Sequence, residues 1–320
     1  MSRFAVCLLG MGAPAGPKAV RGYLYRIFSD RCILPLPAVL RIPAACYIAV
    51  TRSRASKAKY SVIGGQSPFT AQSRAQCQAL AAALDRRGRP MPVIPAMRYA
   101  SPSIGEAVRA MRDEGVTDVV GLSQYPQYSF TTTASCLEAL ERACARAGMR
   151  VVPVPEYPVL PGLVAAWAEA LKAYLPAESP ENRNHVLFLA HSVPMSCVER
   201  GDPYPEHVAR TVNAILGALP RPVEWSLAYQ SRAARGAWLS PSAERAVLDL
   251  ARRGTWRLAV VPVSFVTENL ETRYDIDANL ALLAANAGLR RFARVPVPHA
   301  APALIEGWAD LVEEALRGAQ

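Results

Sequence analysis

Short apolar runs and amphipathic stretches alternate along nearly the whole chain. Runs such as Phe4–Gly10 and Val186–Leu189 are almost wholly apolar, which is typical of parallel strands that are buried on both faces. Between such runs, stretches such as Thr70–Arg86 place their apolar residues on one side, which predicts amphipathic helices. Because strands and helices alternate, the predicted fold class is α/β with doubly wound parallel sheets.

The same pattern predicts the remaining elements. We expect further strands at residues 91–97, 118–122, 150–154, 223–230, 256–265 and around Arg294, and further helices at residues 18–28, 104–113, 137–147, 160–175, 205–219, 242–253, 271–287 and 303–316. Tyr60–Pro68 is predicted to be a strand-like piece that ends in a polar loop, and residues 177–183 are predicted to be a loop. A chain of 320 residues is long enough for two domains. We expect similar domains at residues 1–160 and 161–320, with a cleft between them and the last helix packing back on the first domain.

One segment follows neither the helical nor the strand period. Cys32–Val50 is almost wholly apolar but contains three prolines and Arg41, so it is too interrupted for a transmembrane helix. The basic stretch Arg52–Lys59 follows it. Two interpretations are open: the segment fills the core, or it forms an exposed apolar lip that contacts a membrane or an apolar ligand.

Composition narrows the class of partner. The net charge of +10 favours an anionic partner, but the basic residues are scattered and no nucleic-acid-binding motif is present. We therefore expect an acidic small molecule or a membrane surface rather than nucleic acid. The turn Met11-Gly-Ala-Pro14 departs from G-x-G-x-x-G, which argues against a nucleotide site. Seven cysteines without C-x-x-C spacing predict buried thiols in a reducing compartment, and without a signal peptide or membrane span we expect a cytoplasmic protein.

His191 is the first candidate for chemistry. It follows the apolar run at Val186–Leu189, and Pro194 prevents the strand from simply continuing. Open α/β sheets bind ligands at the carboxyl ends of their strands. An imidazole there can accept a proton near neutral pH or bind a metal ion. The alternative is a structural histidine that is hydrogen-bonded at the end of a strand.

Carboxylates follow a second strand end. Glu271 and Asp275 are four residues apart on the helix predicted after residues 256–265, with Asn279 one turn further. Such a row of acids can carry protons or a divalent cation, although it can also be an ordinary solvated helix face. A histidine base opposite carboxylates, in an apolar cleft with a basic rim, suits the insertion of a metal into a porphyrin. Two pyrrole protons must leave, and the carboxylates of the ring need cationic anchors.

Several short motifs together give a resemblance to a known family over nearly the whole chain. They are Met11-Gly-Ala-Pro, Gly64-Gly-Gln-Ser-Pro, Met97-Arg-Tyr, Gln124-Tyr-Pro-Gln-Tyr-Ser, Ala190-His-Ser-Val-Pro-Met, Glu199-Arg-Gly-Asp-Pro-Tyr-Pro, Tyr229-Gln-Ser, Trp238-Leu-Ser-Pro and Leu270-Glu-Thr. In these the chain resembles the ferrochelatase family. The resemblance implies two Rossmann-like domains with a porphyrin cleft, and insertion of ferrous iron into protoporphyrin IX to give protohaem. Ferrous iron and a porphyrin dicarboxylate are then the substrates. No cofactor is expected to be bound permanently, and no iron–sulfur cluster is expected.

The resemblance also assigns roles to residues. It makes His191 the base that takes the pyrrole protons and Glu271 its acidic partner, with both as metal-binding candidates, and it places Asp275 on the acid path. Met11 corresponds to a position on the opposite side of the ring, where methionine favours protoporphyrin IX over coproporphyrin III. The other expected substrate-binding residues are Arg52, Tyr60, Ser67, Arg98, Tyr128, Ser129 and Trp238. Residues 33–50 correspond to an active-site lip that touches the membrane peripherally.

This sequence departs from the family pattern at two positions of the acidic segment. Asn269 stands where the family usually has histidine, and Asn279 replaces another acid. Two alternatives within enzymes stay open: a coproporphyrin III ferrochelatase, and a chelatase for another divalent metal, because no local feature of a sequence fixes the identity of the metal. A non-catalytic porphyrin or haem carrier is a further alternative. The presence of both His191 and Glu271 argues against a carrier, because binding alone needs neither.

Overall fold

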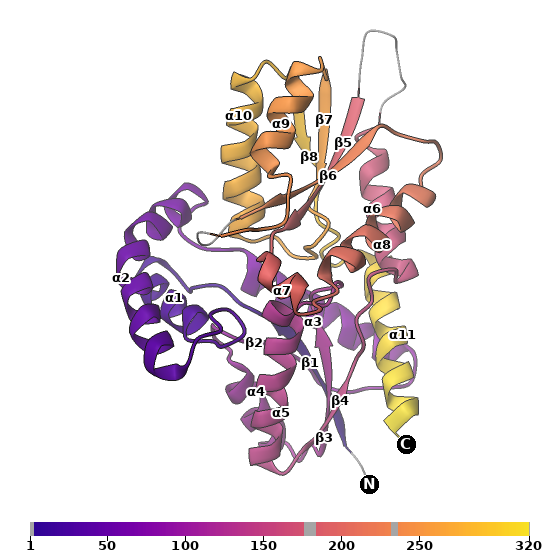
Figure 1. Ribbon diagram of the computed structural model, residues 1–320. Coiled ribbons are helices and arrows are strands. Elements are labelled where there is room, and N and C mark those ends of the chain that lie inside the picture. Colours follow the sequence, from indigo (N-terminus) through magenta and orange to yellow (C-terminus); the bar gives the residue numbers. More distant parts are fainter. Residues whose placement is uncertain (1–2, 176–183, 232–235, 320) are drawn as a thin grey trace. The chain divides into compact units, whose positions relative to one another are not determined.

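The computed structural model describes residues 3–175, 184–231 and 236–319 (Figure 1). The chain divides into two compact units. The first unit comprises residues 1–156 and 305–320, and the second comprises residues 157–304. The second unit thus begins at Tyr157, and the C-terminal residues from Ile305 onwards belong to the first unit. The loop expected at residues 177–183 lies outside the described residues.

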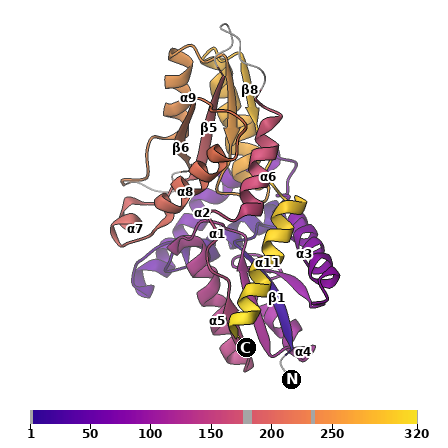
Figure 2. The same ribbon diagram turned by 90° about the vertical axis from the view of Figure 1, so that its right-hand side faces the viewer.

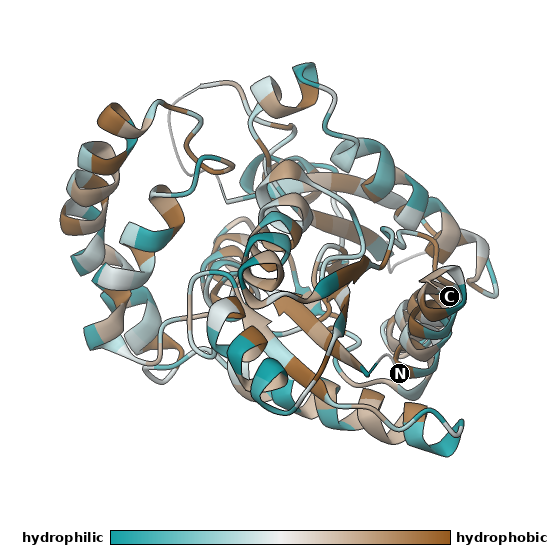
Figure 3. Cartoon of the chain, turned by 90° about the horizontal axis from the view of Figure 1, so that it is seen from below, coloured by the Kyte–Doolittle hydropathy of each residue, from teal (hydrophilic) through white to brown (hydrophobic). Residues whose placement is uncertain are grey.

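The first unit is built on a four-stranded parallel sheet with the order β2-β1-β3-β4. Its two central strands, β1 and β3, are the most buried, and β1 is buried from Ala5 to Leu9. In Figure 3 the strands carry mostly hydrophobic residues, whereas the helices carry both hydrophobic and hydrophilic residues. The strands are β1 (Phe4–Gly10), β2 (Val93–Met97), β3 (Asp118–Ser123) and β4 (Arg150–Pro153).

Helices cover both faces of this sheet. On one face, α4 (Ile104–Asp113) and α5 (Ser135–Ala147) bury a core that includes Cys7 and Leu9. On the other face lies α3 (Phe69–Arg86), near α11 (Pro302–Ala319) (Figure 2). α11 runs beside β4 (Figure 1). Arg87, just after α3, joins the two helices through ion pairs of 2.6 Å to Glu306 and 2.7 Å to Asp310.

A helical hairpin replaces the strand-like piece that was expected near Tyr60. After a short turn, η1 (Pro17–Ala19), the hairpin consists of α1 (Val20–Phe28) and α2 (Ala38–Val62). α2 packs on α1 and buries Ala45, Ala49 and Tyr60, so tertiary packing outweighs the local strand preference of Tyr60-Ser-Val-Ile. Several of the other apolar side chains of Cys32–Val50 are exposed: Val39 is 80 % exposed, Tyr47 71 % and Leu40 59 %. The apolar segment is therefore surface, not core.

The second unit repeats the same strand order, β6-β5-β7-β8, again wholly parallel. One face buries Leu187, Leu189 and Val260 against helices that include α9 (Ala243–Arg252) and α10 (Ala281–Asn286). Figure 1 shows α6 (Pro161–Lys172) and α8 (Tyr204–Gly217) on the opposite side of the sheet from α9 and α10, and the short α7 (Met195–Glu199) precedes α8. The strands are β5 (Asn184–His191), β6 (Trp225–Gln230), β7 (Arg257–Val261) and β8 (Arg291–Arg294).

The structure refines the helix type and the ends of some predicted elements. The helix expected at residues 271–287 is a π-helix, η3 (Glu271–Leu280), which continues into α10. A second π-helix, η2 (Phe130–Ala134), precedes α5. β7 ends at Val261 because Pro262 has no N–H to donate, and β8 ends at Arg294, where the last strand was expected to be centred. Apolar spacing does not distinguish a π-helix from an α-helix, so the period of η3 was not visible in the sequence.

Candidate active site

His191 is the last residue of β5, which pairs with β6 on one side and β7 on the other. The backbone N–H of His191 donates to Ser264 Oγ at 3.0 Å. Its ring Nδ1 lies 2.7 Å from the carbonyl oxygen of Ser192. Because a carbonyl can only accept, Nδ1 carries the hydrogen, and in the neutral ring the lone pair is on Nε2. The imidazole is therefore held in the tautomer that can accept a proton at Nε2.

The turn after His191 runs alongside Trp238, which the sequence placed in the same site. Pro194 and Trp238 form an antiparallel bridge. Leu239 N–H donates to the carbonyl of Val193 at 3.2 Å, which ties the two segments together. The structure thus brings the predicted ring-packing tryptophan next to the segment that carries the predicted base.

Strand register places His191 on the side of the sheet that the acidic helix covers. Side chains alternate between the two faces of a strand, so His191 points the same way as Leu189. Leu189 belongs to the buried cluster that also contains Ile276 of η3. Asp275 of the same helix accepts a hydrogen bond of 3.3 Å from Ser231 Oγ, directly after β6. Glu271 lies in the first turn of η3.

A buried ion network, which no sequence motif predicted, adjoins the acidic helix. Glu268 is 5 % exposed, and its carboxylate accepts a bond of 2.9 Å from Arg294 at the end of β8. Arg294 also donates twice to Asp277 of η3, at 2.7 and 2.9 Å. Burial opposes the charge of Arg294, but the hydrogen bond and charge of Asp277 and the charge of Glu268 outweigh it and raise the pKa of the guanidinium. This arginine fastens η3 to the sheet through two carboxylates.

Asn269 caps the segment that carries Glu271. Its side-chain Oδ1 accepts from Thr272 N–H at 2.9 Å, and its own N–H donates to Thr272 Oγ1 at 3.0 Å. The Thr272 hydroxyl in turn donates to Glu268 at 2.6 Å. This is the reciprocal arrangement of a capping box. Asn269, which departs from the family pattern, thus has a structural role. The spacing Asn-x-x-Thr in the sequence could have predicted this cap.

In the first unit, Arg98 follows β2 and is engaged by protein groups. Its guanidinium lies 2.6 Å from the Asp30 carboxylate and donates to Ser135 Oγ at 2.9 Å. Asp30 also accepts from the Tyr99 hydroxyl at 2.7 Å. Burial alone would raise the pKa of Asp30, but the hydrogen bonds from Ser135, Cys32 and Tyr99 and the charge of Arg98 lower it. Arg98 is thus half of a buried ion pair, which the propionate-anchor prediction did not foresee.

Three other predicted residues also follow strand ends in this unit. Met11 comes directly after β1, and its N–H donates to the Tyr125 hydroxyl at 3.0 Å. Tyr128 and Ser129 follow β3, and the buried Ser129 Oγ accepts from Thr131 N–H at the start of η2. The first unit therefore gathers Met11, Arg98, Tyr128 and Ser129 at the carboxyl edge of its sheet, because parallel strands all end there.

The remaining predicted residues of this unit lie on or next to the helices. Arg52 is on the exposed side of α2, with its guanidinium carbon 5.6 Å from the centre of the Phe28 ring. Tyr60 is buried near the end of α2. Ser67 Oγ accepts from Phe69 N–H at 3.3 Å, at the start of α3.

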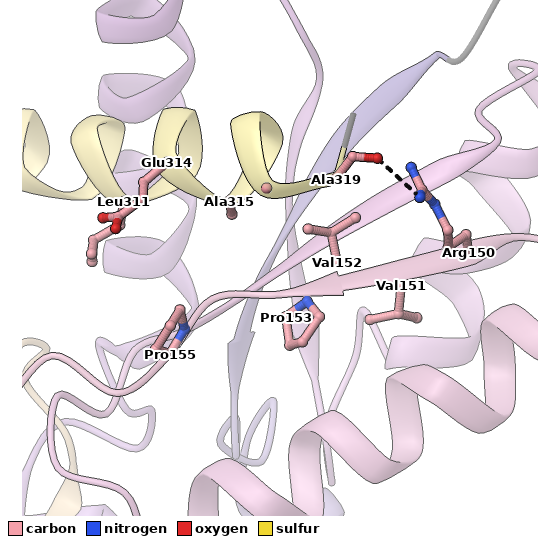
Figure 4. A pocket seen from close by; sticks show the side chains of 10 residues that line it. Arg150, Val151, Val152, Pro153, Pro155, Leu311, Glu314, Ala315 and Ala319 are labelled. Carbon is pink, nitrogen blue, oxygen red and sulfur yellow. Dashed lines mark hydrogen bonds between the residues drawn. The ribbon is translucent and has the colours of Figure 1, made fainter.

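Of two surface cavities of this unit, one contains no predicted site residue and the other contains only one, Arg98. A groove of about 430 Å³ lies between β4 and α11, and no predicted site residue lines it (Figure 4). Its Arg150 donates to the carbonyl of Ala319 at 3.2 Å. A cavity of about 410 Å³ at the start of α4 contains Arg98 together with Arg142 and Arg146 of α5. Within residues 3–175, 184–231 and 236–319, no three His, Cys, Asp or Glu side chains are grouped as a metal site.

Comparison with known proteins identifies the family. The family model described as Ferrochelatase matches residues 3–316. The ferrochelatase of Cyanothece sp. is 38% identical over 324 residues, which cover 99% of this chain and 84% of that protein. The ferrochelatase of Aquifex aeolicus is 37% identical, with 96% of this chain and 98% of that protein covered.

The chain belongs to the ferrochelatase family. It is therefore a metal-inserting lyase of haem biosynthesis, as the sequence motifs predicted. Among solved structures, SirB from Bacillus subtilis matches with a TM-score of 0.58 and 12% identity, covering 98% of this chain and 95% of SirB. That likeness concerns the fold alone, and it confirms the predicted α/β class of this ferrochelatase-family chain.

Replacement of Arg98 by leucine is expected to destabilise the protein, because it leaves the Asp30 carboxylate, whose side chain is only 3% exposed, without its cation. Breaking a buried pair costs about 3–5 kcal/mol, and we expect the low end because Arg98 itself is 21% exposed. The pKa of Asp30 is lowered on folding, so its ionised form stabilises the fold fully above pH 3.8 and this contribution is lost as the pH falls through the lowered pKa. The stability difference between parent and variant should therefore shrink at acid pH.

Chemical denaturation between pH 7 and pH 3 measures this difference. Arg142→Leu is the matched control, because Arg142 lines the same cavity but forms an exposed pair of 3.1 Å with Glu138, worth under about 1 kcal/mol. Equal stability of the two variants at pH 7 would contradict a structural role for Arg98.

Asn269→Ala is expected to lower mainly the stability of the protein, and Glu271→Gln mainly its turnover. Loss of the cap should lower the free energy of unfolding by about 1 kcal/mol and reduce turnover less than about tenfold, because no titrating group is removed. Glu271→Gln should leave stability nearly unchanged and reduce turnover at least about 10²-fold. Thermal melting and turnover of both variants on one porphyrin measure this, with Asn269→Asp as a variant that keeps the cap. If folded Asn269→Ala loses as much turnover as Glu271→Gln, the asparagine takes part in the reaction.

Proposed function

We propose that this enzyme inserts ferrous iron into protoporphyrin IX to give protohaem, with His191 accepting the pyrrole protons. The observation that carries the proposal is the bond between His191 Nδ1 and the Ser192 carbonyl, which leaves Nε2 free of hydrogen. Metal insertion requires two N–H protons to leave the ring, so a base fixed in this tautomer is the group that the reaction needs. Its position at the end of a central parallel strand supports the same assignment.

Glu271 and Asp275 are proposed to take part in proton and metal transfer. Glu271 acts as the acidic partner of His191 and, with it, as a ligand of the entering metal, and Asp275 continues the acid path along η3. The neighbouring Glu268 is compensated by Arg294, so its charge is already balanced within the protein. Iron is a substrate in this proposal, and no permanently bound cofactor or iron–sulfur cluster is included.

The porphyrin is proposed to contact residues that the family resemblance assigns. Met11 and Trp238 would pack on the ring, Tyr128 and Ser129 would line its pocket, and Arg52, Tyr60, Ser67 and Arg98 would meet propionates or the wall of the site. The engagement of Arg98 by Asp30 favours Arg52, whose guanidinium is exposed, as the direct anchor. Methionine at position 11 favours protoporphyrin IX over coproporphyrin III.

We also propose that the enzyme is cytoplasmic and touches a membrane surface through its apolar lip, residues 33–50. Within the parts of the chain that the structure describes, no helix is long and apolar enough to span a bilayer. Exposed apolar residues of α2 are followed on the same helix by four basic residues, an arrangement suited to an interface with anionic headgroups. The basic residues are Arg52, Arg54, Lys57 and Lys59.

His191→Ala is expected to lose at least about 10²-fold in turnover, the low end for removal of a general base, while porphyrin affinity is kept. The assay is anaerobic metal insertion by the purified protein, with ferrous iron and with zinc, on protoporphyrin IX and coproporphyrin III. Porphyrin affinity is followed by fluorescence without metal. His185→Gln is the matched control, because His185 lies near the amino end of the same strand and binds Ser226 at 2.9 Å. Near-normal turnover of His191→Ala would exclude the proposed base.

Leu40→Ser and Tyr47→Ser are expected to weaken binding to anionic liposomes and to leave the melting temperature nearly unchanged, because both side chains are exposed. Ala45→Ser is the control, since Ala45 is fully buried on the opposite side of the same helix and should lower the melting temperature instead. Co-sedimentation with vesicles and thermal melting give the two readouts. A loss of stability of about 2–5 kcal/mol in Leu40→Ser, as for core truncations, would contradict a surface lip.

A further inference from the structure

We infer that Gln230 is a further substrate-binding residue of the active site, whose carboxamide NH₂ donates a hydrogen bond to an acceptor that the substrates bring beside His191. The inference rests on the proposed role of His191. Gln230 is the last residue of β6 and is only 4% exposed. Its side-chain Nε2 is buried and has no hydrogen-bond partner within the described residues. A buried amide donor without an acceptor is costly, so such a group calls for a ligand.

The strand register places this amide beside the imidazole. β5 and β6 are parallel neighbours, and His191 is paired directly with Gln230. Paired residues of adjacent strands direct their side chains to the same face of a sheet. Ala228, two residues before Gln230, belongs to the buried cluster that contains Leu189 and Ile276. The amide and the imidazole therefore lie side by side on the face that η3 covers.

Bonds on both sides fix the position of Gln230. Its carbonyl accepts from Ser192 N–H at 2.8 Å, which ties it to the turn after His191. The next residue, Ser231, has a positive φ of 65° and binds Asp275 of η3 at 3.3 Å. A non-glycine residue in this conformation is uncommon and is maintained only where its surroundings hold it. The strand end thus connects the base to the acidic helix, and in the described part of the chain the NH₂ group of the amide between them has no acceptor.

The chemistry of the amide limits its role. A carboxamide does not titrate, so Gln230 neither gives nor takes a proton of the reaction. It can hold an acceptor near His191 while the imidazole receives the proton. The substrates offer two such acceptors: a ring nitrogen of the porphyrin that carries no hydrogen, and the oxygen of a water molecule bound to the divalent ion.

Gln230→Met tests the inference, because methionine has a similar length but no donor. We expect the melting temperature to stay the same or rise, since an unpaired buried donor is removed. We expect kcat/KM to fall about 5–10-fold, the effect of losing one neutral hydrogen bond. The pH profile of the reaction should keep its shape. Asn184→Leu is the matched control: the Asn184 amide is likewise buried and without a partner in the described part of the chain, but it lies at the amino end of β5. It should leave kcat/KM unchanged.

Two further measurements separate the two acceptors. A higher Kd for protoporphyrin IX without metal, measured by fluorescence, indicates a ring nitrogen. A higher KM for ferrous iron at unchanged porphyrin Kd indicates the metal-bound water. Parental kinetics in Gln230→Met would overturn the inference, and so would a loss of stability, because the amide would then have a structural partner. If the parent inserts metal and His191→Ala does not, normal kinetics in Gln230→Met overturn the inference about Gln230 but leave the proposed function standing. An inactive parent would instead contradict the proposed function.

Discussion

Parallel strand pairing is the constraint on which the candidate active site depends. In each unit the first strand lies between two others, in the orders β2-β1-β3-β4 and β6-β5-β7-β8. Because the strands are parallel, residues that follow them gather at one edge of each sheet. In the second unit His191 ends β5, Gln230 ends β6 and Glu271 follows β7. A shift of β5 by a single residue would turn His191 to the other face and separate it from the acidic helix.

Each unit also contains a buried ion pair just beyond its strand ends. Asp30 pairs with Arg98 after β2, and Glu268 pairs with Arg294 at the end of β8. In both cases a hydroxyl group also donates to the carboxylate, from Tyr99 in the first unit and from Thr272 in the second. Desolvation makes such pairs weak contributors to net stability, but removing one partner is costly. We interpret them as devices that fix the segments after the strands in one geometry.

The π-helix η3 brings several of these constraints together. Its first turn carries Glu271, its middle carries Asp275, and its Asp277 is held by Arg294. Asn269 and Thr272 close its start through reciprocal hydrogen bonds. π-helical segments are rare and occur frequently at functional sites. Such strained segments persist only where surrounding contacts hold them. Here the contacts come from a cap, an arginine and the hydroxyl of Ser231 after β6.

The sequence alone determined the α/β class, the strand that ends at His191 and the acidic residues that follow β7, because apolar runs and their stops are local properties of the chain. The tertiary structure decided that the apolar segment before Arg52 is surface, because exposure depends on what packs against a helix. It also decided the partners of Arg98 and Glu268, since ion pairs join residues that are distant in the sequence. The π-helix η3 and the Gln230 amide, which has no partner for its Nε2 among the described residues, likewise arise only when strands and helices pack, and neither leaves a pattern in the order of the residues.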